Sequence, residues 1–158
     1  MNTTNPASVV DADTFTVRRT IRIDAPVEKV WRAVTEPEYI AQWFGRPVLV
    51  GSGAGAVGTI TWPGRDPIPL RVETYDAPHL VAYRWNNDDA LGSAPDAIDG
   101  STSTVFTFTL DEVAGRTQLT VVETGFDQTS DAASNMASHA TGWTSELDKL
   151  VALVESAS

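Results

Sequence analysis

The sequence contains no cysteine and only two histidines among its 158 residues. Disulfide bonds, thiolate metal sites and cysteine nucleophiles are therefore excluded. A histidine-based triad has only His79 and His139 to draw on, so we expect neither a hydrolase of that kind nor a metal or other cofactor. A chain without cysteine fits a reducing compartment, and we expect a cytoplasmic protein.

Basic residues are also scarce. Eleven Lys and Arg stand against 21 Asp and Glu, which gives a net charge of −10. Such a surface repels phosphate backbones and anionic lipid, so nucleic acid is not an expected partner. No apolar run approaches the length of a membrane span, and no charged-then-apolar leader precedes the first predicted strand. We therefore expect no membrane insertion.

The remaining composition is that of a folded domain. Hydrophobic residues make up 42% of the chain and include five tryptophans, which excludes a largely disordered protein. The length suits a single domain with a sizeable core. Residues 1–13 are small, polar and aperiodic, and they predict a flexible tail ahead of one domain over residues 14–156.

Hydrophobic periodicity predicts a strand, two short helices and a series of strands. Residues 14–24 alternate between apolar and polar and predict the first strand. Residues 23–45, IDAPVEKVWRAVTEPEYIAQWFG, predict two short helices that open at Pro26 and Pro37. The period then becomes two as far as residue 124. Six further strands are predicted, at residues 47–50, 57–62, 68–75, 80–85, 102–110 and 118–124.

Residues 130–155 predict a long helix. Its apolar stripe has the spacing 4, 3, 4, 3, 4 and consists of Met136, Ala140, Trp143, Leu147, Leu150 and Val154. At about 1.5 Å per residue this helix would cross a whole sheet. Its second half carries bulky apolar residues, whereas its first half is rich in alanine and contains Gly142. Small residues facing a curved sheet either leave a void or permit close approach, and the sequence leaves both open.

Several motifs, taken with this order of elements, resemble one superfamily. They are Ala25-Pro26 with Val30-Trp31, Trp43-Phe44, Tyr83-Arg84-Trp85, Gly125-Phe126 and Gly142-Trp143. The chain resembles the START-like superfamily (helix-grip, polyketide cyclase/Bet v-like), in the branch named for the heat-shock chaperone ATPase activator. The resemblance implies an α+β helix-grip fold, in which a curved antiparallel sheet of about seven strands wraps around the C-terminal helix. Residues 50–58 and the acidic loop at 88–99 depart from the usual pattern, so no particular substrate carries over.

The resemblance also implies an apolar tunnel between the long helix and the sheet. Its expected lining is Trp43, Phe44, Trp62, Phe106, Phe108, Met136, His139 and Trp143. Such an aromatic cavity with few polar groups is the general form of a small-molecule site. Each of these aromatic residues could equally be ordinary core.

Three polar residues are candidates for orienting a ligand. His139 lies one helical turn before Trp143 and could hydrogen-bond a ligand, or it could flank the helix half exposed. Glu123 shares strand parity with Leu119 and could partner His139 or Arg84, or it could meet water at a strand end. A buried and unpaired Glu123 would have a raised pKa. Apolar residues occupy alternate positions on both faces of residues 80–85, so the sequence leaves open whether the side chain of Arg84 or that of Trp85 points inward.

Two other patterns resemble known binding motifs but do not predict a nucleotide or calcium site. Residues 53–58 match the dinucleotide-binding pattern G-x-G-x-x-G, but a predicted strand follows where that site requires a helix, so we expect a hairpin loop. The spacing of the aspartates at 88–99 does not match a calcium-binding loop, which favours a solvated acidic loop. Whether residues 50–58 and 86–101 act as lids stays open.

The hypothesis from sequence is therefore binding of a small apolar or amphipathic molecule in an internal cavity, with binding favoured over catalysis. One alternative is an enzyme in the same cavity, such as a cyclase, dehydratase or hydrolase of a polyketide-like substrate. The other is a protein-interaction module with a chaperone partner, which the family name supports weakly because fold does not imply function. A homodimer is compatible with any of these.

Overall fold

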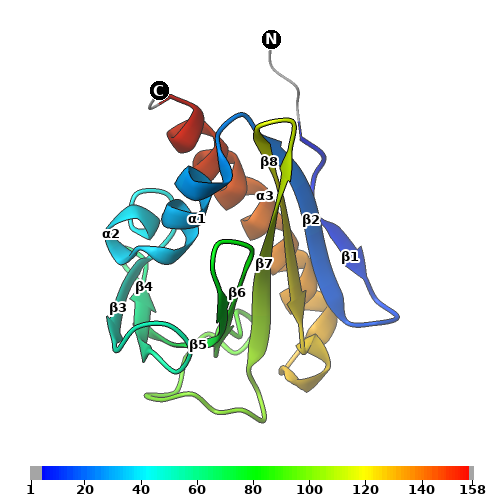
Figure 1. The fold of residues 1–158 in the computed structure, drawn as a ribbon. Coiled ribbons are helices and arrows are strands. Elements are labelled where there is room, and N and C mark those ends of the chain that lie inside the picture. The colour runs from blue at the N-terminus through cyan, green and yellow to red at the C-terminus, as the bar shows by residue number, and fades with distance from the viewer. Residues whose placement is uncertain (1–4, 157–158) are drawn as a thin grey trace.

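The computed structural model describes residues 5–156. Eight strands and a long helix dominate the fold (Figure 1). The strands are β1 (Val9–Asp11), β2 (Thr16–Ile23), β3 (Arg46–Val50), β4 (Val57–Thr61), β5 (Ile68–Asp76), β6 (Leu80–Trp85), β7 (Thr104–Val113) and β8 (Arg116–Thr124). The helices are α1 (Val27–Thr35), α2 (Pro37–Ile40), the 3₁₀ turn η1 (Phe126–Gln128) and α3 (Ala132–Ser156).

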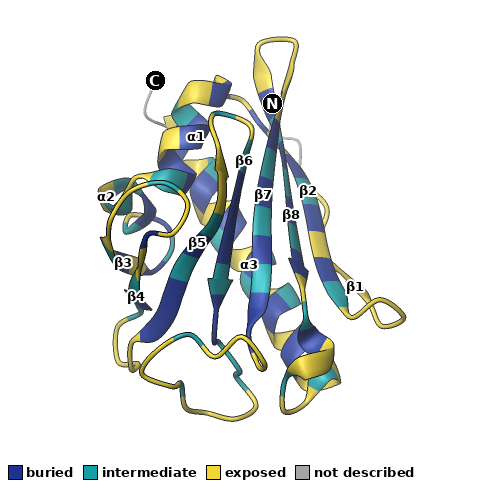
Figure 2. Cartoon of the chain, turned by 60° about the horizontal axis from the view of Figure 1, so that its bottom comes forward, coloured by how far each residue is buried: buried dark blue, intermediate teal, exposed yellow. Residues whose placement is uncertain are grey.

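The strands form one antiparallel sheet in the order β1-β2-β8-β7-β6-β5-β4-β3. The helix α3 lies across one face of this sheet (Figures 1 and 2). The short helix α2 lies beside β3, and α1 packs against α2, α3 and β7. This arrangement confirms the predicted α+β helix-grip fold. Among the described residues, no helix is long and apolar enough to cross a membrane.

The sheet has one strand more than predicted. Val9–Asp11, which we assigned to a flexible tail, form the edge strand β1 and pair with β2. The segment is also attached to α3, because the backbone N–H and hydroxyl of Ser8 both contact the hydroxyl of Thr144. Three residues of edge strand are too short for a periodic signal in the sequence. Residues 1–4 of the predicted tail lie outside the described residues.

Alternation along the strands places the core between the sheet and α3. In β8, and in β7 as far as Leu110, every second residue is buried, and the register sets Phe106 opposite Glu123 and Phe108 opposite Val121. Most of the stripe predicted for α3 is buried, namely Met136, Trp143, Leu147, Leu150 and Val154. The buried face of α3 also includes two polar residues in its first half, Asn135 and His139.

The prolines open both short helices as expected. Pro26 is the N-cap of α1, and Pro37 is the first residue of α2, positions at which a missing N–H costs no helical hydrogen bond. The chain then turns at Gly45 into β3. A Cβ atom at Gly45 would lie 2.7 Å from Cγ1 of Ile60, so only glycine lets the turn pack this closely against β4.

Candidate functional site

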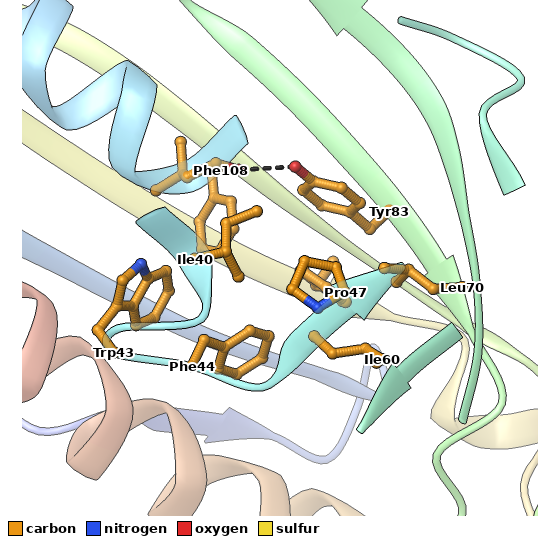
Figure 3. Close-up of a pocket in the computed structure, with 10 residues that line it drawn as sticks. Ile40, Trp43, Phe44, Pro47, Ile60, Leu70, Tyr83 and Phe108 are labelled. Atoms are coloured by element: carbon orange, nitrogen blue, oxygen red, sulfur yellow. Dashed lines mark hydrogen bonds between the residues drawn. The ribbon is translucent and has the colours of Figure 1, made fainter. Parts of the chain in front are cut away.

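Aromatic and aliphatic side chains fill most of the space between the two short helices and the sheet. The gap enclosed by α1, α2 and the sheet has a volume of about 10 Å³, room for no more than one water molecule (Figure 3). The ring of Phe44 stacks on Trp43 and on Trp143, with centroids 5.0 and 5.4 Å apart. The hydroxyl of Tyr83 donates to the backbone carbonyl of Val34 at 2.6 Å, which closes this region on the α1 side. The described residues therefore leave no open passage here.

A larger pocket, here called the aromatic pocket, lies between the middle of α3 and the ends of β4 and β6. Its volume is about 390 Å³. Its lining consists of Phe44, Trp62, Pro63, Arg65, Trp85, Asn87, Asp89, Ser138, His139, Gly142, Trp143 and Glu146. Phe44 contacts Trp62 edge-on with centroids 4.8 Å apart, and together with Trp143 these rings form a continuous apolar wall. Charged and hydroxyl groups lie on the same lining, so the pocket is amphipathic.

The adjacent residues Trp43 and Phe44 face different parts of the molecule. Trp43 is buried, and its Nε1 donates to the carbonyl of Ala33 in α1 at 2.8 Å. Phe44 is only partly buried and contributes to the wall of the aromatic pocket. The turn after α2 therefore supplies one residue to the core and one to the site.

Gly142 opens the floor of the aromatic pocket. It lies in the interior of α3 with ordinary helical backbone, and a Cβ atom built on it would meet nothing within 4 Å. Glycine in a helix interior is less favourable than alanine by roughly 1 kcal/mol. Packing within the described chain therefore gives no reason for glycine at this position, whereas the pocket gains space from it.

Behind the pocket, the carboxylate of Glu123 receives four hydrogen bonds. His139 Nδ1 and Trp143 Nε1, both on α3, donate to Oε1 at 2.8 and 2.9 Å. Trp85 Nε1 on β6 donates to Oε2 at 2.9 Å, and the hydroxyl of Thr104 on β7 donates to the same oxygen. Because a carboxylate offers about four lone-pair sites, the fully buried Glu123 is completely satisfied.

His139 carries a proton on both ring nitrogens in this arrangement. Its Nδ1 faces the Glu123 carboxylate, and its Nε2 lies 2.9 Å from the backbone carbonyl of Asn87 and 3.4 Å from Oδ2 of Asp89. All three are acceptors, so both nitrogens must donate. Burial alone would lower the pKa of His139, but the charge and hydrogen bond of Glu123 outweigh it and raise this pKa to about 9.

The Glu123–His139 contact is therefore a buried ion pair. Burial alone would raise the pKa of Glu123, but the charge of His139 and the surrounding donors hold it below its usual value. The raised pKa expected of an unpaired carboxyl does not occur, because the carboxylate is paired. With every polar atom engaged, neither group is free to exchange a proton with a ligand, and the pair chiefly fastens α3 to the sheet.

The structure divides the predicted site residues among three places. Phe44, Trp62, His139 and Trp143 line the aromatic pocket, and Glu123 lies directly behind it. Trp43, Phe106, Phe108 and Met136 are buried in the core. Arg84 lines neither space; it points to the opposite face of the sheet, where it donates to Glu73 at 2.8 Å and to Ser103 at 2.7 Å. The sixth strand thus turns Trp85 inward.

Sequence reasoning missed several lining residues. Gly142 was noted in a small-residue stretch and in a family motif but not as a lining residue, although an isolated glycine inside a helical pattern is itself a signal of a packing or functional requirement. Arg65 and Asp89 lie in loops that carry no periodicity. Their position in the site follows from tertiary packing alone.

Comparison with known proteins agrees with the fold and the motifs. A family model described as Activator of Hsp90 ATPase homolog 1-like protein matches residues 24–155. The chain belongs to this family. The resemblance to the chaperone-activator branch of the START-like superfamily is thus confirmed. No curated protein that was compared gives a significant match.

Solved structures similar to this family member include DynU16, described as a protein in the dynemicin biosynthetic locus. DynU16 is 28% identical to this chain, with a TM-score of 0.70. The match covers 89% of this chain but 47% of DynU16, so this chain spans about half the length of DynU16. Protein MLL2253 from Mesorhizobium loti is 25% identical with a TM-score of 0.74, covering 90% of this chain and 98% of that one. The Aha1 dimer from Colwellia psychrerythraea is 19% identical with a TM-score of 0.66, covering 89% and 96%, and shows the shared fold alone.

Proposed function

We propose that this protein binds a small apolar or amphipathic molecule in the aromatic pocket. The observation that carries the proposal is Gly142, a helix-interior glycine on the pocket lining beside which a Cβ atom would meet open space. A position that lowers helix stability without serving the packing of the chain is best explained by what the space receives.

The pocket has the size and chemistry for such a ligand. Its volume of about 390 Å³ lies in the usual range for small-molecule sites, roughly 300–1,000 Å³. The rings of Phe44, Trp62 and Trp143 would contribute most of the affinity, at roughly 25 cal/mol per Å² of apolar surface removed from water. Asp89 and Ser138 on the lining, joined to each other by a hydrogen bond of 2.7 Å, would orient the polar end of the ligand.

Catalysis on a polyketide-like substrate in the same pocket has less support. The two groups suited to acid–base work, Glu123 and His139, already have a partner for every polar atom. A reaction would require one of these bonds to break first. We therefore propose binding rather than turnover as the primary activity.

The proposal is tested by ligand-observed NMR with neutral bicyclic aromatic probes, beginning with 2-naphthol. Its binding should also quench tryptophan fluorescence, because Trp62, Trp85 and Trp143 line the pocket. Gly142→Leu places a side chain in the open space and should abolish binding, whereas Gly142→Ala should weaken it far less. Absence of binding by the wild-type protein, or unchanged binding by Gly142→Leu, would refute the proposal.

The oligomeric state is measured on the same samples by light scattering. The Colwellia relative is described as a dimer, and a homodimer or a chaperone partner would also fit the family. If the wild-type protein binds no probe but forms a dimer or captures a purified chaperone ATPase, the interaction-module alternative replaces the ligand-binding proposal.

A further inference from the structure

A second pocket, here called the polar pocket, adjoins the aromatic pocket. It has a volume of about 240 Å³ and lies between the β4–β5 connection and the start of the loop that follows β6. Arg65 and Asn87 line both pockets. The two spaces are therefore the two sides of one ridge, and a molecule longer than either pocket could lie across it.

The ridge is held by a weak contact. Nη2 of Arg65 donates to Oδ1 of Asp89 at 3.2 Å, and the Arg65 side chain is 53% exposed. Half-exposed ion pairs of this kind contribute little to stability, so the arginine can move at low cost. Two consecutive residues next to this contact belong to different pockets: Asp88 lines the polar pocket, and Asp89 lines the aromatic pocket.

The floor of the polar pocket is fixed by its own hydrogen bonds. The side-chain amide of Asn86 donates to the carbonyl of Asp99 and accepts from its N–H, at 3.1 and 2.8 Å. The carboxylate of Asp88 accepts from Ser130 and from the side chain of Asn135, which attaches the loop to the beginning of α3. This part of the site is preorganised rather than formed by the ligand.

Three polar side chains on the lining have no hydrogen bond to any described part of the chain: the amide of Asn87, the hydroxyl of Ser93 and the carboxylate of Asp66. With the free N–H groups of Arg65 they offer both donors and acceptors. A hydroxyl group satisfies both kinds. A carboxylate ligand would lie beside Asp66 and Asp88, and an ammonium group could not accept a hydrogen bond from the Arg65 N–H groups that do not bind Asp89.

We propose that the two pockets form one elongated site for an amphipathic molecule whose aromatic part enters the aromatic pocket and whose neutral, hydroxyl-rich part, such as a sugar, enters the polar pocket. This inference rests on the proposed function, since the aromatic pocket must first bind a ring system. It adds a second subsite and the chemical class of the group that it takes.

Matched probes separate the two claims. Affinities of 2-naphthol and its β-D-glucoside, and of 4-phenylphenol and its β-D-glucoside, are measured by calorimetry near neutral pH, where all four are uncharged. One or two added hydrogen bonds should make each glucoside bind roughly threefold to tenfold more tightly than its aglycone. Asp66→Leu should reduce that ratio to about one. The control Asp96→Leu, in the loop after β6 but outside both linings, should keep the wild-type ratio.

Each outcome has a distinct meaning. If the aglycones bind and Gly142→Leu blocks them, but the glucosides bind no more tightly, the polar subsite is refuted and the proposed function stands. A sugar gain that persists in Asp66→Leu also refutes the subsite, because the sugar then lies elsewhere. If neither glucosides nor aglycones bind the wild-type protein, both proposals fail together.

Discussion

Nδ1 of His139 lies 2.8 Å from Oε1 of Glu123, and this contact joins the middle of α3 to the end of β8. Both partners of this ion pair are buried, whereas in the Arg19–Asp148 pair the aspartate side chain is exposed. Because it lies directly behind the aromatic pocket, its protonation state affects both the stability of the fold and the position of the Trp143 ring, whose Nε1 binds the same carboxylate oxygen.

The ion pair makes stability depend on pH in the alkaline range. The pKa of His139 rises from an ordinary 6.5 to about 9 in the folded protein, so its contribution is full below about pH 6.5 and is lost as the pH rises through about 9. We expect the free energy of unfolding to fall by an amount on the order of 3 kcal/mol over that interval. The lowered pKa of Glu123 has the opposite sign, since its contribution is lost in acid.

Urea denaturation at several pH values between about 5 and 10 measures this dependence. His139→Gln removes the titrating group and should flatten the alkaline part of the profile. An alkaline slope of the same size in His139→Gln would show that other groups cause it. NMR titration of the His139 ring gives the folded pKa directly.

Glu123→Gln should be strongly destabilising. The amide is nearly the same size but replaces an acceptor oxygen with a donor, which must face one of the present donors. It also removes the nearest counter-charge of the buried His139 and leaves only the carboxylate of Asp89, at 3.4 Å. We expect a loss of about 3–5 kcal/mol in the free energy of unfolding, measured with urea. The double variant Glu123→Gln/His139→Gln should lose much less than the sum of the two single changes. Additive losses would argue against the ion pair.

The order and type of elements could be predicted because the signals are local. Each strand within residues 104–124 buries one face, and so does the helix from Met136 to Val154. A single buried face gives the sequence a regular hydrophobic period, which can be recognised without knowing what the face packs against. The exception, β1, is held by pairing with β2 and by the contact of Ser8 with Thr144, which lies 136 residues away. Neither interaction leaves a pattern in the sequence of the segment itself.

The site was predictable only in part, for a related reason. Glu123 and His139 could be proposed as partners because parity and helical spacing orient each side chain within its own element. The inward orientation of the Trp85 side chain could not be predicted, because apolar residues occupy both faces of β6. Its partner strand β5 also has an irregular register between Val72 and Thr74. Whether the rings filled the interior or left it hollow depends on side-chain packing across elements, which no spacing rule describes.

Gly142→Ala should stabilise the protein. The new methyl group meets no atom within 4 Å, and the helix gains roughly 0.5–1 kcal/mol from a better helix former with fewer unfolded conformations. For a chain of this length the melting temperature should rise by about 1–4 °C. Differential scanning calorimetry measures it. A lower melting temperature would mean that the glycine serves packing, and the argument from Gly142 to the pocket would lose its basis.

Gly58→Ala should have the opposite effect. Gly58 lies inside β4, and a Cβ atom there would be 1.8 Å from the backbone oxygen of Val48, so β3 and β4 would have to separate. Backbone atoms cannot yield as a flexible side chain would, and we expect a loss of about 3 kcal/mol or more. Gly53→Ala is the matched control within the same G-x-G-x-x-G stretch. It has open space, and its positive φ costs only about 1–2 kcal/mol.

Urea denaturation of both glycine variants gives the comparison. A markedly larger loss for Gly58→Ala than for Gly53→Ala would show that the last glycine of the stretch is required by close strand pairing, which explains its presence without any nucleotide. Equal losses, or a mild effect of Gly58→Ala, would mean that β3 can move away from β4 at little cost. In that case the β3–β4 edge, which carries the turn from Phe44 through Gly45, would be a mobile wall of the aromatic pocket rather than a fixed one.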